Sequence, residues 1–373
     1  MKNTFWPILA TILFNVSCSK QAENIENKTT SLKYFGEVAL NHGELLLSSY
    51  GFSNNIVGQD SLLIYDQGSK LLVLFDLQKK IPIHTIAVNL DGPDFFDPPF
   101  QDAEIRNDSL FLLSRNSFNI YNLDGKALMR FRTEDLQTHK ISSFVFDFHL
   151  TDFQLLEENK VLFSKVPIDV IVTNFQSQEK PKLFFTLNLL TKEISEIPVF
   201  SPKESLIDDR TIGYYNDFSF HSMVINHDSI IYSFPFTSKT FIYDMGTKEQ
   251  TEIEAPFKFA ENLREPISAV DNKNTEKWVD YVYSGPKFSA IERDDETGFY
   301  VRVVMQNEKL SNGDKKDDRY LMLLNEKLEV IEEIKLKEMV FIEPAVSNGI
   351  IYLYLGNPSV EGAYSFVAYE IVK

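Results

Sequence analysis

Cysteine is almost absent from this chain, which has one, Cys18, among its 373 residues. A single cysteine excludes an internal disulfide and any zinc site built from cysteines. Several catalytic motifs are absent as well: there is no His-Glu-x-x-His metal motif, no phosphate-binding loop, no dinucleotide fingerprint and no Gly-x-Ser-x-Gly elbow. The sequence therefore predicts no cofactor.

Positive charge is also scarce, with 37 Lys and Arg against 54 Asp and Glu, a formal net charge of −17. Nucleic acids are bound largely through neutralised phosphates, so we expect no nucleic-acid partner. The same charge opposes electrostatic adsorption to an anionic membrane surface. Hydrophobic residues make up 43% of the chain, which is enough for a large core and excludes an intrinsically disordered protein.

The N-terminus carries the features of an export signal. Lys2 precedes an apolar run over residues 5–16, which is too short to span a membrane, and small Ser17 precedes Cys18. The pattern resembles a bacterial lipoprotein signal peptide, although Asn15 stands where such signals favour Leu. The resemblance implies cleavage before Cys18 and acylation of that cysteine. The alternative is an ordinary secretory signal with a chance cysteine.

A polar segment, residues 18–31, follows the signal and lacks an apolar period, which predicts a flexible tether. Within it, Gln21-Ala22-Glu23 is similar to the signal by which Bacteroidota lipoproteins reach the outer face of the outer membrane. Asn24 departs from that signal, because a second acid is expected there. The resemblance implies an outer-membrane lipoprotein, periplasmic or surface-exposed, that is held to the membrane by an acyl anchor.

The rest of the chain repeats. Each copy begins with turn-forming residues and continues into leucine, β-branched or aromatic residues, which predicts a turn that opens a buried strand. Further strands follow each copy, in units spaced by roughly 50–70 residues, which indicates the blades of a propeller. The six copies are Asp60–Tyr65, Asp108–Leu113, Asn159–Phe163, Asp228–Tyr232, Thr297–Val301 and Asn348–Tyr352.

The sixth unit lacks an outer strand, because the chain ends after strand-like segments at 350–355 and 365–372. Another strand-like segment, residues 32–40, precedes the first unit. We therefore predict one all-β domain, residues 32–373, folded as a six-bladed β-propeller. In this prediction residues 32–40 complete the last blade and remove an exposed pair of sheet edges. The alternative is a frayed N-terminus beside an incomplete last blade.

The long connections of this propeller all fall on one face. Connections between blades share that face with the connections between strands two and three of each blade. Long loops in compact domains usually carry function, so we expect this face to bind a ligand. The alternative is that insertions drift neutrally on a face that points away from the anchor. The long connections are residues 89–101, 133–143, 167–179, 200–216, 255–284, 306–318 and 356–363.

Several loop residues suit ligand contacts. Tyr, Trp and Arg are favoured at interfaces, and aromatic rings beside carboxylates also suit sugars. The alternative for each ring is packing of blade against blade, since the chain has 31 Phe and 16 Tyr. The candidate ligand-binding residues are Phe96, Asp97, Phe100, Arg210, Tyr214, Tyr215, Arg264, Trp278 and Tyr283.

His149 and His221 are weaker candidates for a metal site. Each falls in a predicted innermost strand, of blades three and four, from which side chains can point into the central channel. Asp147, Asp217 or Glu343 would complete the set of ligands. A buried, hydrogen-bonded histidine is the commoner outcome.

The lipoprotein signal, the six units and the length resemble an uncharacterised Bacteroidota lipoprotein family. That family is a domain of unknown function, related to TolB-like six-bladed propellers, whose Gly-Pro connectors are similar to Gly92-Pro93 and Gly285-Pro286. The resemblance implies a fold and an address, and no catalytic residues. It favours a non-enzymatic, lipid-anchored binding or scaffold module for an envelope protein or a glycan. The alternative is a propeller hydrolase or lyase, acting on a sugar or lactone with a metal in the central channel.

Overall fold

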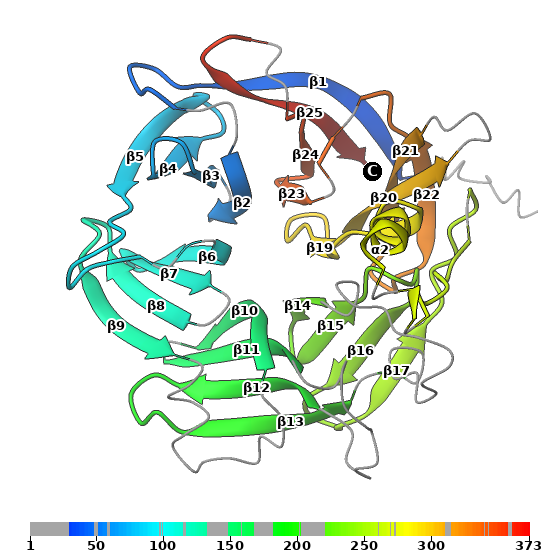
Figure 1. The fold of residues 1–373 in the computed structure, drawn as a ribbon, viewed down its shortest axis with the longest axis horizontal. Coiled ribbons are helices and arrows are strands. Elements are labelled where there is room, and N and C mark those ends of the chain that lie inside the picture. The colour runs from blue at the N-terminus through cyan, green and yellow to red at the C-terminus, as the bar shows by residue number, and fades with distance from the viewer. Residues whose placement is uncertain are drawn as a thin grey trace, which may run out of the picture.

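Six small antiparallel sheets form a closed ring around a central axis (Figure 1). The predicted all-β, six-bladed propeller is thereby confirmed. Helix α2, Thr275–Val282, lies in the connection between the fourth and fifth blades. The computed structural model describes residues 30–47, 51–57, 60–96, 98, 100–114, 117–132, 148–157, 159–167, 182–200, 202, 221–259, 261–268, 270–271, 274–309, 315–338, 340–341, 343–356 and 360–373.

Each of the first three blades has four strands, which follow the chain from the axis outward. Blade I consists of β2 (Gly51–Val57), β3 (Ser61–Asp66), β4 (Leu71–Asp76) and β5 (Ile81–Ala87). Blade II consists of β6 (Phe100–Arg106), β7 (Ser109–Ser114), β8 (Ser117–Asn122) and β9 (Ala127–Arg132). Blade III consists of β10 (Phe148–Glu157), β11 (Lys160–Pro167), β12 (Lys182–Asn188) and β13 (Ile194–Phe200).

The other three blades include one with a divided inner strand and one that joins the two ends of the propeller. Blade IV consists of β14 (Ser222–Asn226), β15 (Ser229–Ser233), β16 (Thr240–Asp244) and β17 (Gln250–Ile253). Blade V consists of β18 (Gly285–Phe288), β19 (Glu292–Arg293), β20 (Tyr300–Lys309), β21 (Lys315–Leu324) and β22 (Val330–Lys335). Blade VI consists of β23 (Pro344–Ser347), β24 (Ile350–Tyr354), β25 (Ala363–Val372) and β1 (Ser31–Asn41).

The N-terminal strand β1 closes the ring, as predicted. It pairs antiparallel with β25, from Ser31 opposite Val372 to Asn41 opposite Ala363, with a bulge before Gly36. Gly36 has φ 135°, a conformation that residues with a side chain rarely adopt, so a glycine suits this bulge. The closure pairs the first strand of the domain with the last and leaves no open seam between blades VI and I.

The two sides of the ring differ in their connections. We call the side with the connections between blades, and between strands two and three of a blade, the loop face. The opposite side, with the connections between strands one and two and between three and four, is the turn face. Ser31 lies on the turn face, because its partner Val372 ends β25 there, and neighbouring Ile371 donates a backbone hydrogen bond of 2.8 Å to Gly349.

The sequence repeat has a physical cause in the turn face. Its copies open the second strand of each blade, and their first residues form the turn from the innermost strand. The turn carbonyl of Asp60 accepts a hydrogen bond from Leu77 N at 2.9 Å, and Asp228 accepts from Met245 N at 2.8 Å. Asp108 adopts the left-handed conformation at φ 58°, which favours Asp, Asn and Gly. Turn chemistry thus selects the residues that recur.

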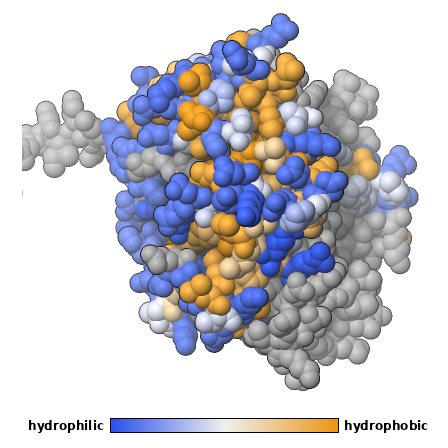
Figure 2. All heavy atoms as spheres, turned by 90° about the vertical axis from the view of Figure 1, so that its left-hand side faces the viewer, coloured by the Kyte–Doolittle hydropathy of each residue, from blue (hydrophilic) through white to orange (hydrophobic). Residues whose placement is uncertain are grey.

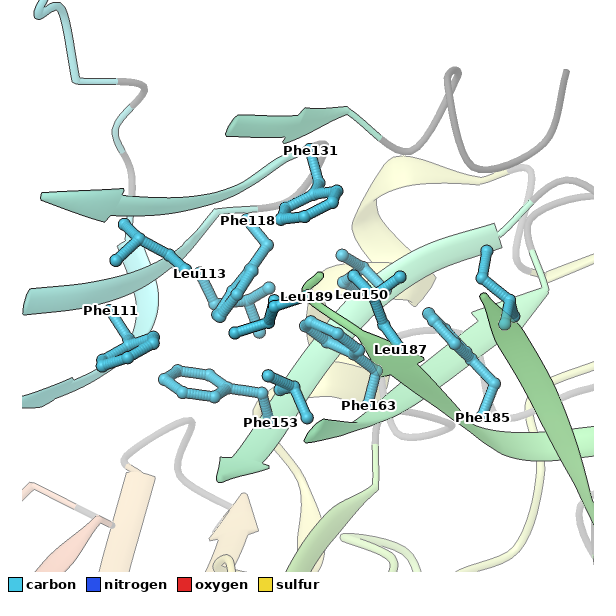
Figure 3. Close-up of a cluster of buried hydrophobic side chains, with 13 residues drawn as sticks. Phe111, Leu113, Phe118, Phe131, Leu150, Phe153, Phe163, Phe185, Leu187 and Leu189 are labelled. Carbon is cyan, nitrogen blue, oxygen red and sulfur yellow. The ribbon is translucent and has the colours of Figure 1, made fainter. Parts of the chain in front are cut away.

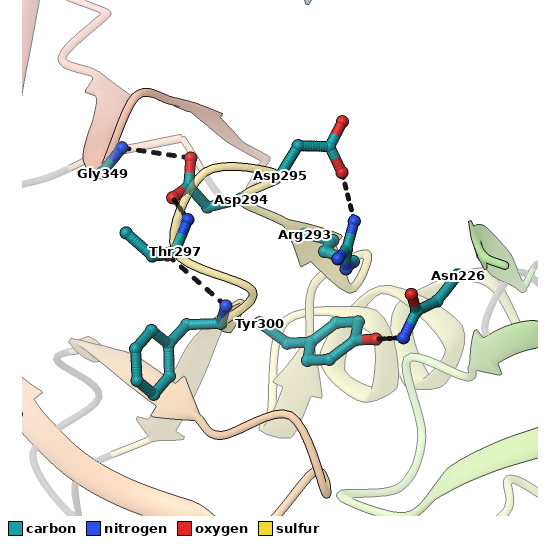
Figure 4. A network of polar contacts seen from close by, with 8 residues as sticks. Asn226, Arg293, Asp294, Asp295, Thr297, Tyr300 and Gly349 are labelled. Carbon is teal, nitrogen blue, oxygen red and sulfur yellow. Dashed lines mark hydrogen bonds and ion pairs between the residues drawn. The ribbon is translucent and has the colours of Figure 1, made fainter.

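Polar contacts on the turn face also join blades IV, V and VI (Figure 4). Asp294, only 1% exposed, accepts hydrogen bonds from Thr297 N at 2.8 Å and from Gly349 N of blade VI at 3.1 Å. On the other side of blade V, Asn226 Nδ2 donates to Tyr300 Oη at 2.9 Å. The turns are therefore fastened to one another and not only to their own blades.

The core consists of apolar clusters between neighbouring blades. Between blades II and III, the ring of Phe118 contacts Phe163 and Phe153 with centroids 4.8 and 5.1 Å apart, and Phe163 stacks on Phe185 (Figure 3). Aromatic contacts of this kind contribute about 0.5–1.5 kcal/mol each beyond the burial of their area. The predicted alternative for most rings, packing of blade against blade, is what these clusters show.

The outer strands carry exposed apolar residues. Figure 2 shows the outer rim on the side of β5 and β9, where hydrophobic residues form a band between hydrophilic ones. On these strands Ile81, Ile83 and Leu128 are 44%, 49% and 56% exposed. The alternating burial of β5 is that of a strand with one face in the core and one in solvent.

Candidate functional site

Phe96 and Phe100, predicted to contact a ligand, are core residues in the structure. Phe96 is 2% exposed and stacks on Tyr121 with centroids 4.0 Å apart. Phe100 is 9% exposed and meets Tyr65 edge to face at 4.8 Å. Both belong to the cluster between blades I and II, because a ring at the end of a connection gains more by filling that cluster than by facing water. This burial removes both residues from the candidate ligand surface.

Other predicted site residues lie outside the described part of the chain. These are Asp97, Arg210, Tyr214, Tyr215 and the proposed lipidation site Cys18. The backbone of His149 is in β10, the innermost strand of blade III, as predicted, but its side chain lies outside the description.

His221 is buried directly before β14, the innermost strand of blade IV. Its Nε2 lies 2.8 Å from Ser164 Oγ, which is 2.6 Å from Thr151 Oγ1, and its ring packs against Phe184 and Phe234. Ser164 is 0% exposed, so this serine and histidine pair offers no nucleophile to a substrate. His221 is a buried, hydrogen-bonded histidine, the alternative stated for it. Among the described residues, no three His, Cys, Asp or Glu side chains converge as ligands for a metal ion.

The central channel instead gathers carboxyl groups from the inner strands of four blades. Asp102 of blade II acts electrostatically on Asp152 of blade III, Glu292 of blade V and Glu343, which precedes the inner strand of blade VI. Electrostatic interactions weaken with distance, so carboxyl groups from four blades that act on one another must all point toward the common axis. The side chains of Asp102, Asp152 and Glu292 are half-buried: each retains some contact with solvent, and protein surrounds the rest of it.

Burial and this repulsion change the protonation of the channel acids. Burial, followed by the charges of Asp102 and Glu343, raises the pKa of Glu292 to about 8. Burial and the proximity of Asp102 raise the pKa of Asp152 well above its usual value. Glu292 is therefore mostly protonated at neutral pH, and a protonated carboxyl can act as a general acid.

The same acids also join neighbouring blades. Asp152 Oδ2 accepts a hydrogen bond from Met223 N of blade IV at 2.8 Å, and Asp102 Oδ2 accepts a longer one from Phe153 N of blade III at 3.4 Å. Ser222 continues the series, because its Oγ accepts from Ile291 N of blade V at 3.2 Å. Blades II to V are thus connected by one side-chain acceptor per inner strand.

The axial acids Asp102, Asp152 and Glu292 were not among the residues that the sequence singled out, whereas Glu343 was. A signal for two of them exists. Asp102 and Asp152 each follow a bulge in an inner strand, at the same position relative to the blade. In the sequence these acids stand six and seven residues before the repeat copies that begin at Asp108 and Asn159, and this offset is the signal.

The connection between blades IV and V, residues 254–284, holds three predicted contact residues, and the first, Arg264, is buried. It is 4% exposed, its Nη1 donates to Pro286 O at 3.3 Å, and its guanidinium lies 4.2 Å from the centre of the Tyr281 ring. Burial lowers the pKa of Arg264, although the guanidinium stays charged at neutral pH. Arg264 therefore supports the connection from beneath and does not reach a ligand at its surface.

Trp278 and Tyr283, in contrast, lie at the surface of this connection. Helix α2 begins after Asn274, whose side chain accepts hydrogen bonds from Glu276 N at 3.0 Å and Lys277 N at 3.2 Å. None of its residues is buried, Trp278 is half-buried, and Tyr283 is 57% exposed just after the helix. In the view of Figure 1 the helix lies over the strands of blade V. These two predicted contact residues are thus accessible on the loop face.

A charged depression of about 510 Å³ lies at the loop-face end of blade V, lined by Asp317–Arg319 and Lys335–Glu338. Its charges largely pair with each other, with Arg319 Nη2 2.9 Å from Asp317 and Lys335 Nζ 2.7 Å from Asp318. Balanced charges at such an exposed position give little selectivity for a charged ligand.

Among the described residues, no helix is long and apolar enough to cross a membrane. No protein-family model matches the sequence, and no curated protein is significantly similar to it. A solved structure of a DUF4221 family member from Bacteroides vulgatus is similar, with a TM-score of 0.68, 16% identity and coverage of 92% of this chain and 99% of the other. A protein from Bacteroides fragilis described as exported has a TM-score of 0.55, 14% identity and coverage of 92% and 96%. At such low identity the similarity shows the fold alone, which this chain shares with the DUF4221 member.

Proposed function

We propose that the protein is a lipid-anchored propeller of the bacterial cell envelope that binds an envelope protein or a glycan through its loop face. The proposed localisation rests on the lipoprotein-like signal that ends at Cys18, and the similar Bacteroides protein described as exported supports it. In this proposal the acylated Cys18 and the segment after it hold the propeller at the outer membrane, in the periplasm or at the surface. The family proposal is a Bacteroidota lipoprotein related to TolB-like propellers.

One observation carries the binding proposal: the chain enters the ring on the turn face, whereas connections of the opposite, loop face hold exposed apolar residues. Ser31 begins β1 on the turn face, so a tether from Cys18 leads to that side. Four of the exposed apolar residues that the structure describes lie in one connection, residues 254–284, and an exposed apolar patch is typical of a surface that contacts a partner. The exposed apolar residues of the loop-face connections are Leu46, Leu90, Phe259, Leu263, Val270, Tyr283, Phe341 and Val360.

The test is capture of partners from envelope extracts by the chain from Ser19 onward. A loop-face variant combines Phe259→Ser, Val270→Ser and Tyr283→Ser, and Leu190→Ser is the matched control, because Leu190 is 71% exposed in a turn of the turn face. We expect a partner that the wild type and the control retain and the loop-face variant loses. Equal capture by all three proteins would reject the loop face as the binding surface.

The anchor is tested separately by Cys18→Ser in the full chain. Acylation of Cys18 predicts that wild-type protein incorporates a labelled fatty acid and partitions into a detergent phase. The variant should lose both properties. Labelling that survives the substitution would reject Cys18 as the anchor.

A second candidate function is a hydrolase or lyase that acts on a sugar or lactone through the channel carboxyls. Its support is Glu292, which carries the proton that a general acid needs at neutral pH. Lactone or glycan cleavage that Glu292→Gln abolishes and Glu104→Gln retains would support it, because Glu104 of the inner strand of blade II is held in an ion pair with Arg106.

A further inference from the structure

The connection between blades IV and V forms a platform on the loop face. We use acidic platform for its described residues between Glu254 and Ser284. Its exposed apolar members are Phe259, Leu263, Val270 and Tyr283, at 48%, 39%, 80% and 57%. Half-buried Trp278 lies between them in the chain, on a helix none of whose residues is buried. Aromatic residues held in this way are typical centres of protein interfaces.

Strong contacts fix the platform from beneath. Arg264 N donates to Phe236 O at 2.8 Å, and its guanidinium reaches Pro286 O. Asn262 donates to Phe257 O at 3.2 Å, and its carbonyl accepts from Ser238 N at 2.9 Å. These contacts join the platform to blades IV and V. A surface that is already ordered loses less conformational entropy when a partner binds.

The charges of the platform select the partner. The two lysines that the structure describes in it are paired: Lys258 Nζ lies 3.2 Å from the buried Glu333, and Lys277 forms an ion pair with Asp271. Three exposed acids, Glu261, Glu265 and Glu276, form no ion pair with any described residue. Among the described residues of the platform, the uncompensated surface charge is therefore negative, within a chain whose net charge is −17.

We propose that the acidic platform docks a cationic segment of a partner protein that also carries apolar side chains. Lysine or arginine of the segment would meet Glu261, Glu265 and Glu276, while its apolar residues cover Tyr283 and Trp278. Complementary charge speeds association and suppresses wrong partners, and burial of the rings supplies the affinity. The proposal rests on the loop-face function above and specifies the chemistry of its partner.

Trp278 gives the proposal a direct test. The chain has two tryptophans, Trp6 and Trp278, so a protein that starts at Ser19 has Trp278 alone as its fluorescent reporter. The probes are an amphipathic peptide built from leucine and lysine and its twin with glutamate in place of lysine. We expect the lysine peptide to change Trp278 emission, less strongly at high salt, and the glutamate peptide to have no effect.

Matched variants separate the platform from the general acidity of the chain. Glu261→Lys with Glu276→Lys should weaken lysine-peptide binding by about fivefold or more, as expected for two exposed charge pairs. Glu193→Lys with Glu249→Lys makes the same charge change in exposed turns of the turn face and should leave binding within about twofold. Tyr283→Ser should weaken binding, and Leu190→Ser should not.

Equal binding of the two peptides, or equal weakening by both double charge variants, would overturn the proposal. If the lysine peptide fails to bind while partner capture still depends on the loop face, the cationic partner is rejected and the binding function stands. If partner capture is also unaffected by loop-face substitutions, both proposals fail.

Discussion

Arg302 offers a sharp test of how the ring supports its loop face, because it is a cation with no exposed surface. Its guanidinium donates to Ser238 O at 3.0 Å and to Phe234 O at 3.1 Å, with longer contacts to Thr237 O and Ser289 O. The acceptors lie in the β15–β16 connection of blade IV and beside the inner strand of blade V. Burial lowers the pKa of Arg302 to about 9, because the charged guanidinium loses its contact with water in the folded state.

Two effects of Arg302→Met oppose each other. The substitution removes a buried charge, which taken alone stabilises the fold by several kcal/mol. It also leaves buried carbonyl oxygens without their donors, at about 1–3 kcal/mol for each of four acceptors. Because four acceptors lose donors, we expect the second effect to win and the free energy of unfolding to fall by about 3 kcal/mol.

Urea unfolding measures this loss. With a slope of about 3 kcal/mol per molar urea, the midpoint should fall by about 1 M. The β15–β16 connection also holds the acidic platform, since Thr237 pairs with Leu263 and Ser238 N bonds to Asn262 O. Trp278 emission should therefore change at lower urea than the circular dichroism of the strands.

Arg302→Lys separates the two effects, because lysine keeps the charge and supplies up to three donors in a different geometry. If hydrogen bonding dominates, Lys should recover part of the stability that Met loses. A Met variant as stable as the wild type would refute the reasoning, because it would show that the buried charge costs more than its hydrogen bonds contribute.

Three further predictions concern the channel and the ring closure. Glu292 keeps its proton in the folded state up to about pH 8, whereas the carboxyl of the unfolded chain ionises near pH 4.5. The free energy of unfolding should therefore fall as pH rises from about 4.5 to 8. Glu292→Gln should reduce this pH dependence of the urea midpoint. His42, buried against Tyr364 with centroids 4.7 Å apart, has its pKa lowered by burial, only partly offset by Asp66. Stability should therefore also fall as pH drops below about 6.5, and His42→Phe should remove that loss while keeping the ring contact. Deleting residues 31–41 should lower the thermal midpoint of the whole domain and not of blade VI alone, since β1 closes the ring; an unchanged midpoint in calorimetry would contradict this role.

Local chemistry explains which parts of the structure were predictable. The turns that open the second strands need residues such as Asp108 that tolerate left-handed backbone, so the sequence repeats and the blades can be counted. The missing strand of blade VI follows from the same count. The count depends on local turns, whereas the closing strand was predictable because one outer strand was missing from the last unit, although its partner β25 lies at the other end of the domain.

The fate of individual loop residues depends on contacts that are remote in sequence. Phe96 follows a turn in the sequence like a surface ring, but it stacks on Tyr121 of β8. Arg264 lies in a long connection, but its guanidinium packs over Tyr281. Arg302 stands in a β-strand with nothing in its neighbours to mark a buried cation, because its acceptors come from two other connections. Trp278 and Tyr283 were predicted with the same reasoning, and the structure leaves them accessible.

Strand β1 closes the ring and is also the strand to which the proposed membrane tether leads. If the tether leads from Cys18 to Ser31, any pull between the membrane and a partner on the loop face enters the propeller through β1. That strand runs from the turn face to the loop face, so the pull acts along its axis. The hydrogen bonds from Ser31 opposite Val372 to Asn41 opposite Ala363 then share the load in shear, whereas a pull across the strand would break them one after another. Leu32 N adds a hydrogen bond to Glu332 of blade V near the point where the load enters. If the proposed anchor and partner exist, the antiparallel pairing of β1 with β25, which starts at the turn face, would let the ring hold a partner on its far side while the load stays in shear.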